Sequence, residues 1–392
     1  MTMLLSTLPE SIEFKLLLEL THPTPSLALS DIIAKVQMPQ FNHEKLLKMV
    51  KWHRVTPQVY QQLAPIQDDL PVDFFQSLQR INTRCRMESL KLSTWLAKIT
   101  LLFREENIDF ISLKGIGLSR QLYAESSYRQ CRDIDLLIEA RDIDVAEEVL
   151  TGVGFERTYP PIDVTPKQLA FLNRHKKDRE YLNPKDGTIV EVHWRLTEVD
   201  HPFNPSLNNL LATGDSFAVH GNELNTVSGN DLWLYQSLHG SYSGWYRLRW
   251  ICDIAQLLCH HKPDWNSLLD RAEQYGCRNS LLEAIGMACT LYKLPVPEQI
   301  DQLLRKNRPV WNNIKICNDF LVHMKLMRGV PDIARIHFWA PEKSFIKFLF
   351  THGSITPTDF GRFRFPDTLF FLYYVVRPFS FVYRQLNTKK VS

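Results

Sequence analysis

The chain has 392 residues, enough for two or three domains, and its 44% hydrophobic and 23% charged residues are ordinary for a soluble globular protein. Its 46 basic and 43 acidic residues leave a net charge of +3, so overall charge neither favours nor excludes a nucleic-acid partner. Seven scattered cysteines without a Cys-x-x-Cys pair argue against a disulfide framework or a zinc knuckle and indicate reduced thiols.

The N-terminal region, residues 1–107, has the pattern of helices. Apolar residues recur every three or four positions in segments such as MESLKLSTWLAKITLLF, and prolines separate these segments. The N-terminus lacks a basic start, an unbroken apolar run and a small-residue cleavage site, so we expect no signal peptide. The sequence therefore predicts a helical lead-in region of a cytoplasmic protein.

Residues 108–204 alternate between strands and helices. IDFISL reads as a strand before a glycine-containing turn and a helix, and RDIDLLIEA reads as a second strand. A helix ended by Gly152 and Gly154 follows, and GTIVEVHWRL is a third strand after a Lys-Asp-Gly turn. These elements predict a small mixed sheet.

Beyond residue 205 the pattern returns to helices. They continue to about residue 300, and residues 301–392 match no feature with a recognisable role. The late aromatic run LFFLYYVVRPFSFVY is too short to span a bilayer. Residues 341–392 carry eight Lys or Arg and three acids, but such aromatic runs more often pack onto the protein. We therefore expect no transmembrane segment and no contact with a membrane surface.

Two acids, Asp133 and Asp135, run directly into the apolar part of the second strand. Side chains two residues apart on a strand share one face, so both carboxylates project together. Burying them unpaired would cost several kcal/mol, and a Mg²⁺ or Mn²⁺ ion between them would remove this cost. In the alternative reading, these acids cap a turn or pair with Arg129 and Arg132.

A third acid lies on the third strand. Alternation along TIVEVHWRL places Glu191, His193 and Arg195 on one face and turns Val190, Val192 and Trp194 to the core. We expect Glu191 to converge with the two aspartates. His193 either contacts the substrate or has a structural role.

Lys114-Gly115 occupies the turn between the first strand and its helix. Glycine allows a phosphate to approach the backbone N–H groups at a helix N-terminus, where the peptide dipoles also favour an anion. The pair therefore predicts a phosphate-binding turn upstream of the acids.

The order of these motifs resembles the nucleotidyltransferase superfamily with the DNA polymerase β type of fold, and most closely its bacterial uncharacterised nucleotidyltransferase family. The resemblance covers roughly residues 40–300. Its motifs are Leu113-Lys114-Gly115, Leu122-Tyr123, Arg129, Asp133 to Leu137, Glu191 to Arg195, and the pattern His239, Arg247, Trp250 and Asp253. The chain departs from the broad superfamily at Lys114-Gly115, where Gly-Gly or Gly-Ser is usual, and at Arg132, where small residues are common.

The resemblance implies an α+β fold. Its nucleotidyltransferase core, residues 108–204, would lie between the N-terminal helical region and a helical region, residues 205–300, that supports the substrate. It also implies transfer of a nucleoside monophosphate from a nucleoside triphosphate such as ATP to an acceptor hydroxyl, with Mg²⁺ or Mn²⁺ as cofactor. The metal-binding and catalytic residues would be Asp133, Asp135 and Glu191. The residues that bind the nucleotide or its phosphates would be Lys114, Gly115, Arg129, His193, His239 and Arg247.

Other interpretations remain open at this stage. The acceptor could be a protein, a small molecule or an RNA end, and the chain could instead be an inactive scaffold that binds a nucleotide or a partner. Arg249 and Asp253, four residues apart on a predicted helix, fit a surface ion pair. The adjacent Cys259, His260 and His261 diverge by about 100° per residue on a helix and do not suit one metal ion.

Overall fold

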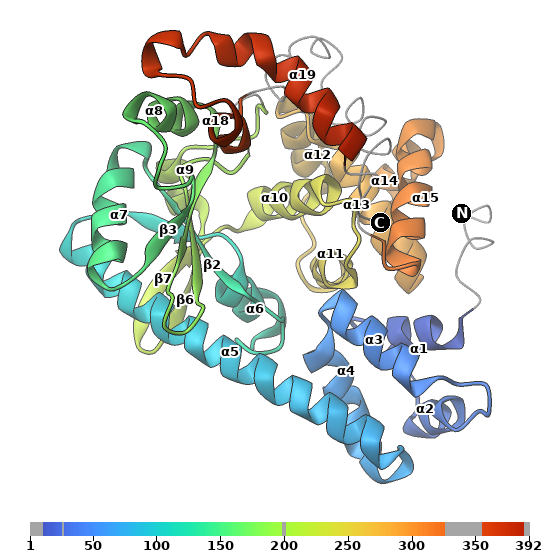
Figure 1. Ribbon diagram of the computed structural model, residues 1–392. Coiled ribbons are helices and arrows are strands. Elements are labelled where there is room, and N and C mark those ends of the chain that lie inside the picture. The colour runs from blue at the N-terminus through green and yellow to red at the C-terminus, as the bar shows by residue number, and fades with distance from the viewer. Residues whose placement is uncertain (1–10, 26, 198–200, 326–354, 388–392) are drawn as a thin grey trace.

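The computed structural model describes residues 11–25, 27–197, 201–325 and 355–387 (Figure 1). Within these residues, helices surround a seven-stranded mixed sheet, which confirms the predicted α+β class. Residues 1–10, part of the N-terminus in which we expect no signal peptide, lie outside the described residues. The same is true of four basic residues of the C-terminal tail: Lys343, Lys347, Lys389 and Lys390.

The N-terminal region forms short helices that lead into one long helix. The short elements are α1 (Ile12–Leu20), α2 (Leu29–Val36), α3 (His43–His53), α4 (Thr56–Leu63) and the 3-10 helix η2 (Ala64–Asp69). The 34-residue helix α5 (Val72–Glu105) follows, and at 1.5 Å per residue it is about 51 Å long. Leu78, near its start, packs into the helical core, whereas Leu96 and Phe103 pack against the sheet. Helix α5 therefore joins the N-terminal helices to the sheet (Figure 1).

The sheet has the strand order β3-β4-β5-β2-β1-β7-β6. Its strands are β1 (Phe110–Ser112), β2 (Asp133–Ile138), β3 (Glu156–Tyr159), β4 (Asp178–Leu182), β5 (Ile189–His193), β6 (Asp215–Val219) and β7 (Asn222–Thr226). The pairs β2–β5 and β1–β7 are parallel, and the other neighbours are antiparallel. The three strands expected from the sequence, β1, β2 and β5, lie side by side at the centre.

Alternation along β2 and β5 separates the apolar side chains from the polar ones. Ile134, Leu136, Val190 and Val192 are buried in one apolar core, and Trp194 joins them there as predicted. The elements between the strands are α6 (Gly115–Tyr123), η3 (Ala140–Asp142), α7 (Ile143–Gly152), α8 (Pro166–His175) and α9 (Leu207–Thr213). Because side chains alternate along a strand, the polar residues of β2 and β5 project from the opposite face of the sheet.

A hairpin formed by β6 and β7 stands where the sequence analysis expects only helices. His220 and Gly221 link the strands, with φ angles of 48° and 80°, as a two-residue type I′ turn requires. Strand β7 joins the sheet beside β1 through the pair Ser112 and Thr226. The sequence signal for this hairpin is weak because His-Gly replaces the usual Asn-Gly. Strands β6 and β7 belong to the sheet although they follow residue 204, the expected end of the nucleotidyltransferase core.

The described elements after the hairpin are all helices. They are α10 (Gly229–Tyr242), α11 (Leu248–His260), α12 (Trp265–Gln274), α13 (Arg278–Tyr292), α14 (Glu298–Lys306), α15 (Arg308–Val322), α18 (Pro357–Phe363), η4 (Asp367–Leu369) and α19 (Leu372–Asn387). Helices α10 and α11 both pack against α13. Tyr373 of α19 packs with Leu172 of α8, so part of the late aromatic run lies on the protein. None of the described helices is long and apolar enough to cross a membrane.

The end of α3 docks onto the start of α11. Trp52 Nε1 donates a hydrogen bond to the Tyr246 carbonyl at 3.2 Å, and the Leu248 N–H donates to His53 Nδ1 at 3.3 Å. Burial, with a smaller effect of Arg247, lowers the pKa of His53 to about 3. His53 is therefore neutral at physiological pH and accepts a hydrogen bond that links the N-terminal region to α11.

We expect His53 to make the protein less stable as the pH falls below 6.5. Its ordinary pKa is 6.5 and its folded pKa is about 3, so the unfolded chain binds one more proton between these values. The free energy of unfolding should therefore decrease by up to about 1.4 kcal/mol per pH unit lost. Urea unfolding of the wild type and His53→Gln at pH 7.5, 6 and 5 measures this slope. Identical slopes in the two proteins would contradict the assignment.

Candidate functional site

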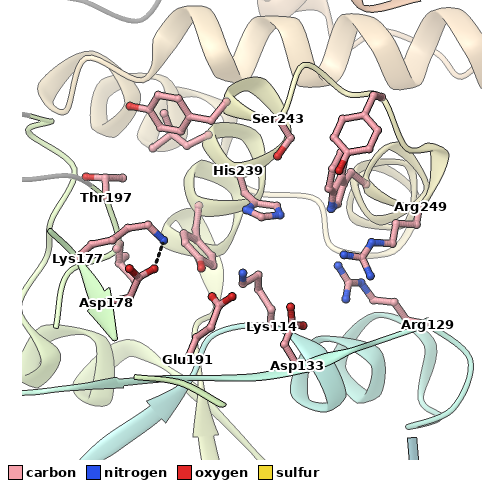
Figure 2. A pocket seen from close by; sticks show the side chains of 16 residues that line it. Lys114, Arg129, Asp133, Lys177, Asp178, Glu191, Thr197, His239, Ser243 and Arg249 are labelled. Carbon is pink, nitrogen blue, oxygen red and sulfur yellow. Dashed lines mark ion pairs between the residues drawn. The ribbon is translucent and has the colours of Figure 1, made fainter. Parts of the chain in front are cut away.

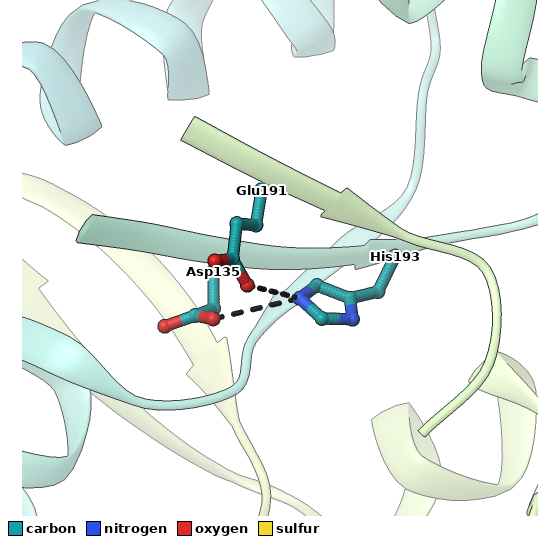
Figure 3. Close-up of side chains that lie close together, drawn as sticks. All are labelled: Asp135, Glu191 and His193. Carbon is teal, nitrogen blue, oxygen red and sulfur yellow. Dashed lines mark hydrogen bonds and ion pairs between the residues drawn. The ribbon is translucent and has the colours of Figure 1, made fainter. Parts of the chain in front are cut away.

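The parallel pairing of β2 and β5 brings together acids that are far apart in the sequence. In the register of these strands, Asp135 stands directly opposite Glu191, and Asp133 stands opposite Ile189. Figure 3 shows the side chains of Asp135, Glu191 and His193 turned toward one another from these two strands. Neighbouring strands lie about 4.8 Å apart, so the register alone places these two acids within reach of one ion.

Asp135 is a fully buried carboxylate that is neutralised within the protein. Lys114 Nζ lies 2.7 Å from Asp135 Oδ1, and His193 Nε2 lies 3.4 Å from the same oxygen. Burial by itself would raise the pKa of Asp135, but Lys114 and then His193 outweigh it and hold this pKa well below its usual range. Asp135 is therefore ionised, with the Lys114 ammonium and the His193 ring held on one of its oxygens.

His193 connects the buried acids to β4. Its Nε2 lies 3.2 Å from Glu191 Oε2, and its Nδ1 lies 3.7 Å from Asp178 Oδ2. Burial and Lys177 lower the pKa of His193, but the contacts with Asp135 and Glu191 outweigh them and raise it. Burial raises the pKa of Glu191. The hydrogen bond with His193 lowers this pKa, but burial together with the charge of Asp135 outweighs that effect.

These residues fit a divalent cation. One ligand atom from each of Asp135, Glu191 and His193 lies within 4.8 Å of the others. Asp135 Oδ2 is buried and has no hydrogen-bond partner among the described residues, which suits an oxygen that ligates a metal. Carboxylate oxygens favour Mg²⁺ or Mn²⁺, and an imidazole suits transition metals better.

A cavity of about 600 Å³ opens beside this cluster. Figure 2 shows Asp133, Glu191 and Lys114 projecting into it from the sheet side and His239 facing them from α10. Its lining residues are Lys114, Arg129, Asp133, Lys177, Asp178, Glu191, Leu196, Thr197, Tyr235, Leu238, His239, Tyr242, Ser243, Tyr246, Arg249 and Trp250. The cavity is thus floored by charged groups of the sheet and walled by aromatic side chains of α10 and α11, a combination that suits a nucleotide.

Lys114 and Gly115 form the turn into α6 next to the acids. Lys114 is the N-cap residue of this helix, and its side chain reaches back to Asp135. Gly115 has φ of +65°, and an added Cβ would lie 3.2 Å from the Asp133 carbonyl oxygen. A side chain at this position would therefore be strained and would press on β2, which explains why glycine stands there.

Arg129 lies in the loop before β2, with its guanidinium facing the cavity. It is 2% exposed, and its Nε donates to Asp253 Oδ2 at 2.9 Å. Tyr123 donates to the same carboxylate at 3.0 Å. The helical spacing predicted a surface ion pair between Arg249 and Asp253, and this prediction is wrong: Asp253 is fully buried and pairs with Arg129, because α11 packs on α6.

His239 and Arg247 have different surroundings. His239 lines the cavity, and burial, reinforced by Lys114, holds its pKa well below the ordinary value, so it faces the cavity as a neutral ring. Arg247 is not among the described residues that line the cavity. Its guanidinium stacks over Trp52 and Tyr246 and donates to the Trp52 carbonyl. The nucleotide contact predicted for Arg247 is therefore without support in this geometry.

Several lining residues were missed by the sequence analysis. Asp178 and Lys177 form an ion pair of 2.9 Å at the start of β4, a strand that was not predicted. Tyr235 was predicted to lie on a helix but not to line a site, and Arg249 was predicted to form a surface ion pair. Only the alternation of DREYL pointed to β4, and nothing local marked which helix residues would face the sheet.

Comparison with known proteins gives one match. A family model described as an uncharacterised nucleotidyltransferase matches residues 39–293, which is more than half of the chain. Searches of curated proteins and of solved structures found no significant match. The matched segment contains every residue that contributes to the cavity.

We expect the two aspartates to differ in their effect on stability. Asp135→Asn leaves the Lys114 ammonium buried without its partner, so it should lower the free energy of unfolding by about 3–5 kcal/mol. Asp133→Asn, at a partly exposed carboxylate, should change it by no more than about 0.5 kcal/mol. Urea denaturation followed by circular dichroism measures both changes.

The double variant Lys114→Met/Asp135→Asn is the control for this prediction. It removes both charges, so it should recover much of the stability lost in Asp135→Asn. Equal unfolding midpoints for the two single variants would show that the ion pair has no such structural role.

Proposed function

This chain belongs to the uncharacterised nucleotidyltransferase family, as its motifs predict, and we propose that it is a metal-dependent nucleotidyltransferase. It moves a nucleoside monophosphate from a nucleoside triphosphate to an acceptor hydroxyl and releases pyrophosphate. The observation that carries the proposal is the register of β2 and β5, because it sets Asp135 opposite Glu191. Asp133 and Lys114 border the same cavity.

Asp133, Asp135 and Glu191 are the proposed ligands of Mg²⁺ or Mn²⁺. When bound, the ion would neutralise the phosphate oxygens and lower the pKa of the acceptor hydroxyl. Among the described residues, Asp133 does not share the cluster of Asp135, Glu191 and His193, but it lines the cavity next to it. Asp135 would hold the ion from the sheet, and Asp133 would complete the site from the cavity.

As the alternative to binding the metal ion, Glu191 is proposed to act as the general base. A raised pKa brings a carboxylate closer to the range in which it can accept a proton from a hydroxyl. In the reaction, the acceptor oxygen forms a bond to the α-phosphorus and its proton passes to Glu191. The bond from this phosphorus to the bridging oxygen breaks, and pyrophosphate leaves. His193, held between Glu191 and Asp178, keeps the Glu191 carboxylate in place.

The triphosphate is bound by cationic and N–H groups of the sheet side. The Gly115 amide at the start of α6 and the Lys114 ammonium contact the phosphates, and Arg129 contributes its guanidinium. His239, being neutral, provides a hydrogen bond to the nucleoside or the acceptor. The acceptor is a protein side chain, a small molecule or an RNA end, and the protein acts in the cytoplasm.

The second candidate is a nucleotide-binding scaffold without turnover. One observation favours it: Lys114 and His193 already neutralise Asp135 from within the protein, so the fold is stable without a catalytic metal. The same groups would compete with the ion for Asp135 Oδ1. A scaffold would bind the triphosphate and leave it intact.

The test is incubation with each radiolabelled nucleoside triphosphate, Mg²⁺ or Mn²⁺, and fractionated cell extract. We expect one triphosphate to be consumed and one fraction to contain the labelled acceptor. Glu191→Gln should lower the rate by about 10²- to 10⁴-fold, the usual contribution of a general base. Glu139→Gln is the matched control, because Glu139 follows β2 at the end away from the cavity. Binding of a triphosphate without any consumption would favour the scaffold.

A further inference from the structure

One end of the cavity carries two buried arginines, Arg129 and Arg249. Arg129 is 2% exposed and Arg249 is 7% exposed, and Figure 2 shows their guanidinium groups side by side, near Asp133 and Lys114. Asp253 bonds to Arg129. Arg249 Nη1 instead donates to the neutral Gln130 carbonyl at 2.7 Å. One positive charge at this end is therefore not balanced by a bonded acid.

Each guanidinium group has one donor that no other described residue accepts from. Arg129 Nη2 and Arg249 Nε are buried and have no hydrogen-bond partner among the described residues. A buried N–H without a partner is destabilising, and more so in a charged group. Burial, and then the repulsion of Arg129, lowers the pKa of Arg249 to about 10, so it remains charged at neutral pH. An anion bound in the cavity beside the two guanidinium groups would relieve their mutual repulsion.

The surrounding elements add positive potential at the same place. Arg249 lies in the first turn of the 13-residue helix α11, whose N-terminus carries a partial positive charge. Arg54 follows α3, which docks on the start of α11, and its Nε is also buried without a hydrogen-bond partner among the described residues. The Leu248 N–H donates to the His53 ring, so Arg54 and Arg249, which are the next residues on these two segments, lie close to each other although Arg54 is not among the described residues that line the cavity. Burial and then Arg249 lower the pKa of Arg54 to about 9.

We propose that Arg129, Arg249 and Arg54 form a diphosphate subsite, which holds the two terminal phosphates of the nucleoside triphosphate and then the pyrophosphate that leaves. Guanidinium groups match phosphate oxygens in pairs of parallel hydrogen bonds, and several of them suit the clustered charge of a diphosphate. The assignment rests on the proposed function and adds Arg249 and Arg54 to it. The nucleotide then lies with its phosphates toward α11, and the acceptor approaches from the side of Lys177 and Asp178.

The subsite also gives the N-terminal helices a part in binding. Arg54 comes from this region, whereas Arg129 belongs to the loop before β2 and Arg249 to α11. A diphosphate bound among them would contact three segments that are far apart in the chain. Its binding should therefore stabilise the contact between α3 and α11.

The experiment is the binding of radiolabelled inorganic pyrophosphate to the full chain by equilibrium dialysis without divalent ions. Loss of a hydrogen bond to a charged group costs about 1.5–3 kcal/mol, so Arg249→Met should weaken pyrophosphate binding by about 10- to 100-fold. Arg54→Met should weaken it less. Arg249→Lys keeps the positive charge but loses the paired N–H donors of the guanidinium, so its affinity for pyrophosphate should lie between those of the wild type and Arg249→Met.

Arg141→Met is the matched control, because Arg141 is 81% exposed in its side chain and is not among the described residues that line the cavity. It should bind pyrophosphate like the wild type. Circular dichroism of each variant identifies any that fail to fold, and Arg54→Met tests the subsite if Arg249→Met does not fold. Wild-type affinity in folded Arg249→Met or Arg54→Met would overturn the proposal for that residue.

A second arm distinguishes the source of the diphosphate. An α,β-methylene nucleoside triphosphate, which cannot be cleaved at the reacting bond, should displace pyrophosphate from the wild type. If it binds without displacing pyrophosphate, the subsite belongs to a phosphorylated acceptor and the proposal is wrong. If pyrophosphate binding depends on Arg249 but no nucleotide is ever transferred, the subsite stands and the proposed catalytic function fails.

Discussion

The burial of the Asp135 carboxylate is the constraint on which the rest of the site depends. A fully buried charge is tolerated only where opposite charges and hydrogen bonds compensate it. Lys114 and His193 supply this compensation, and both must reach one oxygen: Lys114 from the turn after β1 and His193 from the end of β5. The order β5-β2-β1 of the central strands makes this possible. The same arrangement leaves the second oxygen of Asp135 available to a cation.

The charges around the cavity are separated into two ends. At one end, the arginines near α11 carry buried donors without a hydrogen-bond partner among the described residues, and at the other end Lys177 and Asp178 form an ion pair. The acids of β2 and β5 lie between them. The phosphates of a triphosphate are strongly anionic, whereas an acceptor need not be charged. The difference in charge between the two ends of the cavity therefore favours binding of the triphosphate at the arginine end and of the acceptor at the other end. Electrostatic preorganisation of this kind acts without reorganising the protein during the reaction.

The helical regions do more than cover the sheet. Helix α10 brings His239 and Tyr235 over the acids, and α11 brings Arg249 and the buried partner of Arg129. The N-terminal helices are held on α11 by Trp52 and His53. Helix α11 and the N-terminal helices therefore both contribute to the proposed diphosphate subsite. The family match over residues 39–293 includes these contacts, which is consistent with one functional unit.

The sequence by itself determined the central strands, the α+β class, the family and the acids of the candidate site. It could do so because strand alternation and turn glycines are local signals, visible in Asp133, Asp135, Glu191 and Gly115. Only the tertiary structure decided which partners these groups meet. Asp253 bonds to Arg129, which lies 124 positions away in the chain, whereas α-helical spacing alone predicted an ion pair between Asp253 and Arg249. The edge hairpin and β4 were missed because their patterns are short and weakly apolar, and their strand state depends on the neighbours they pair with.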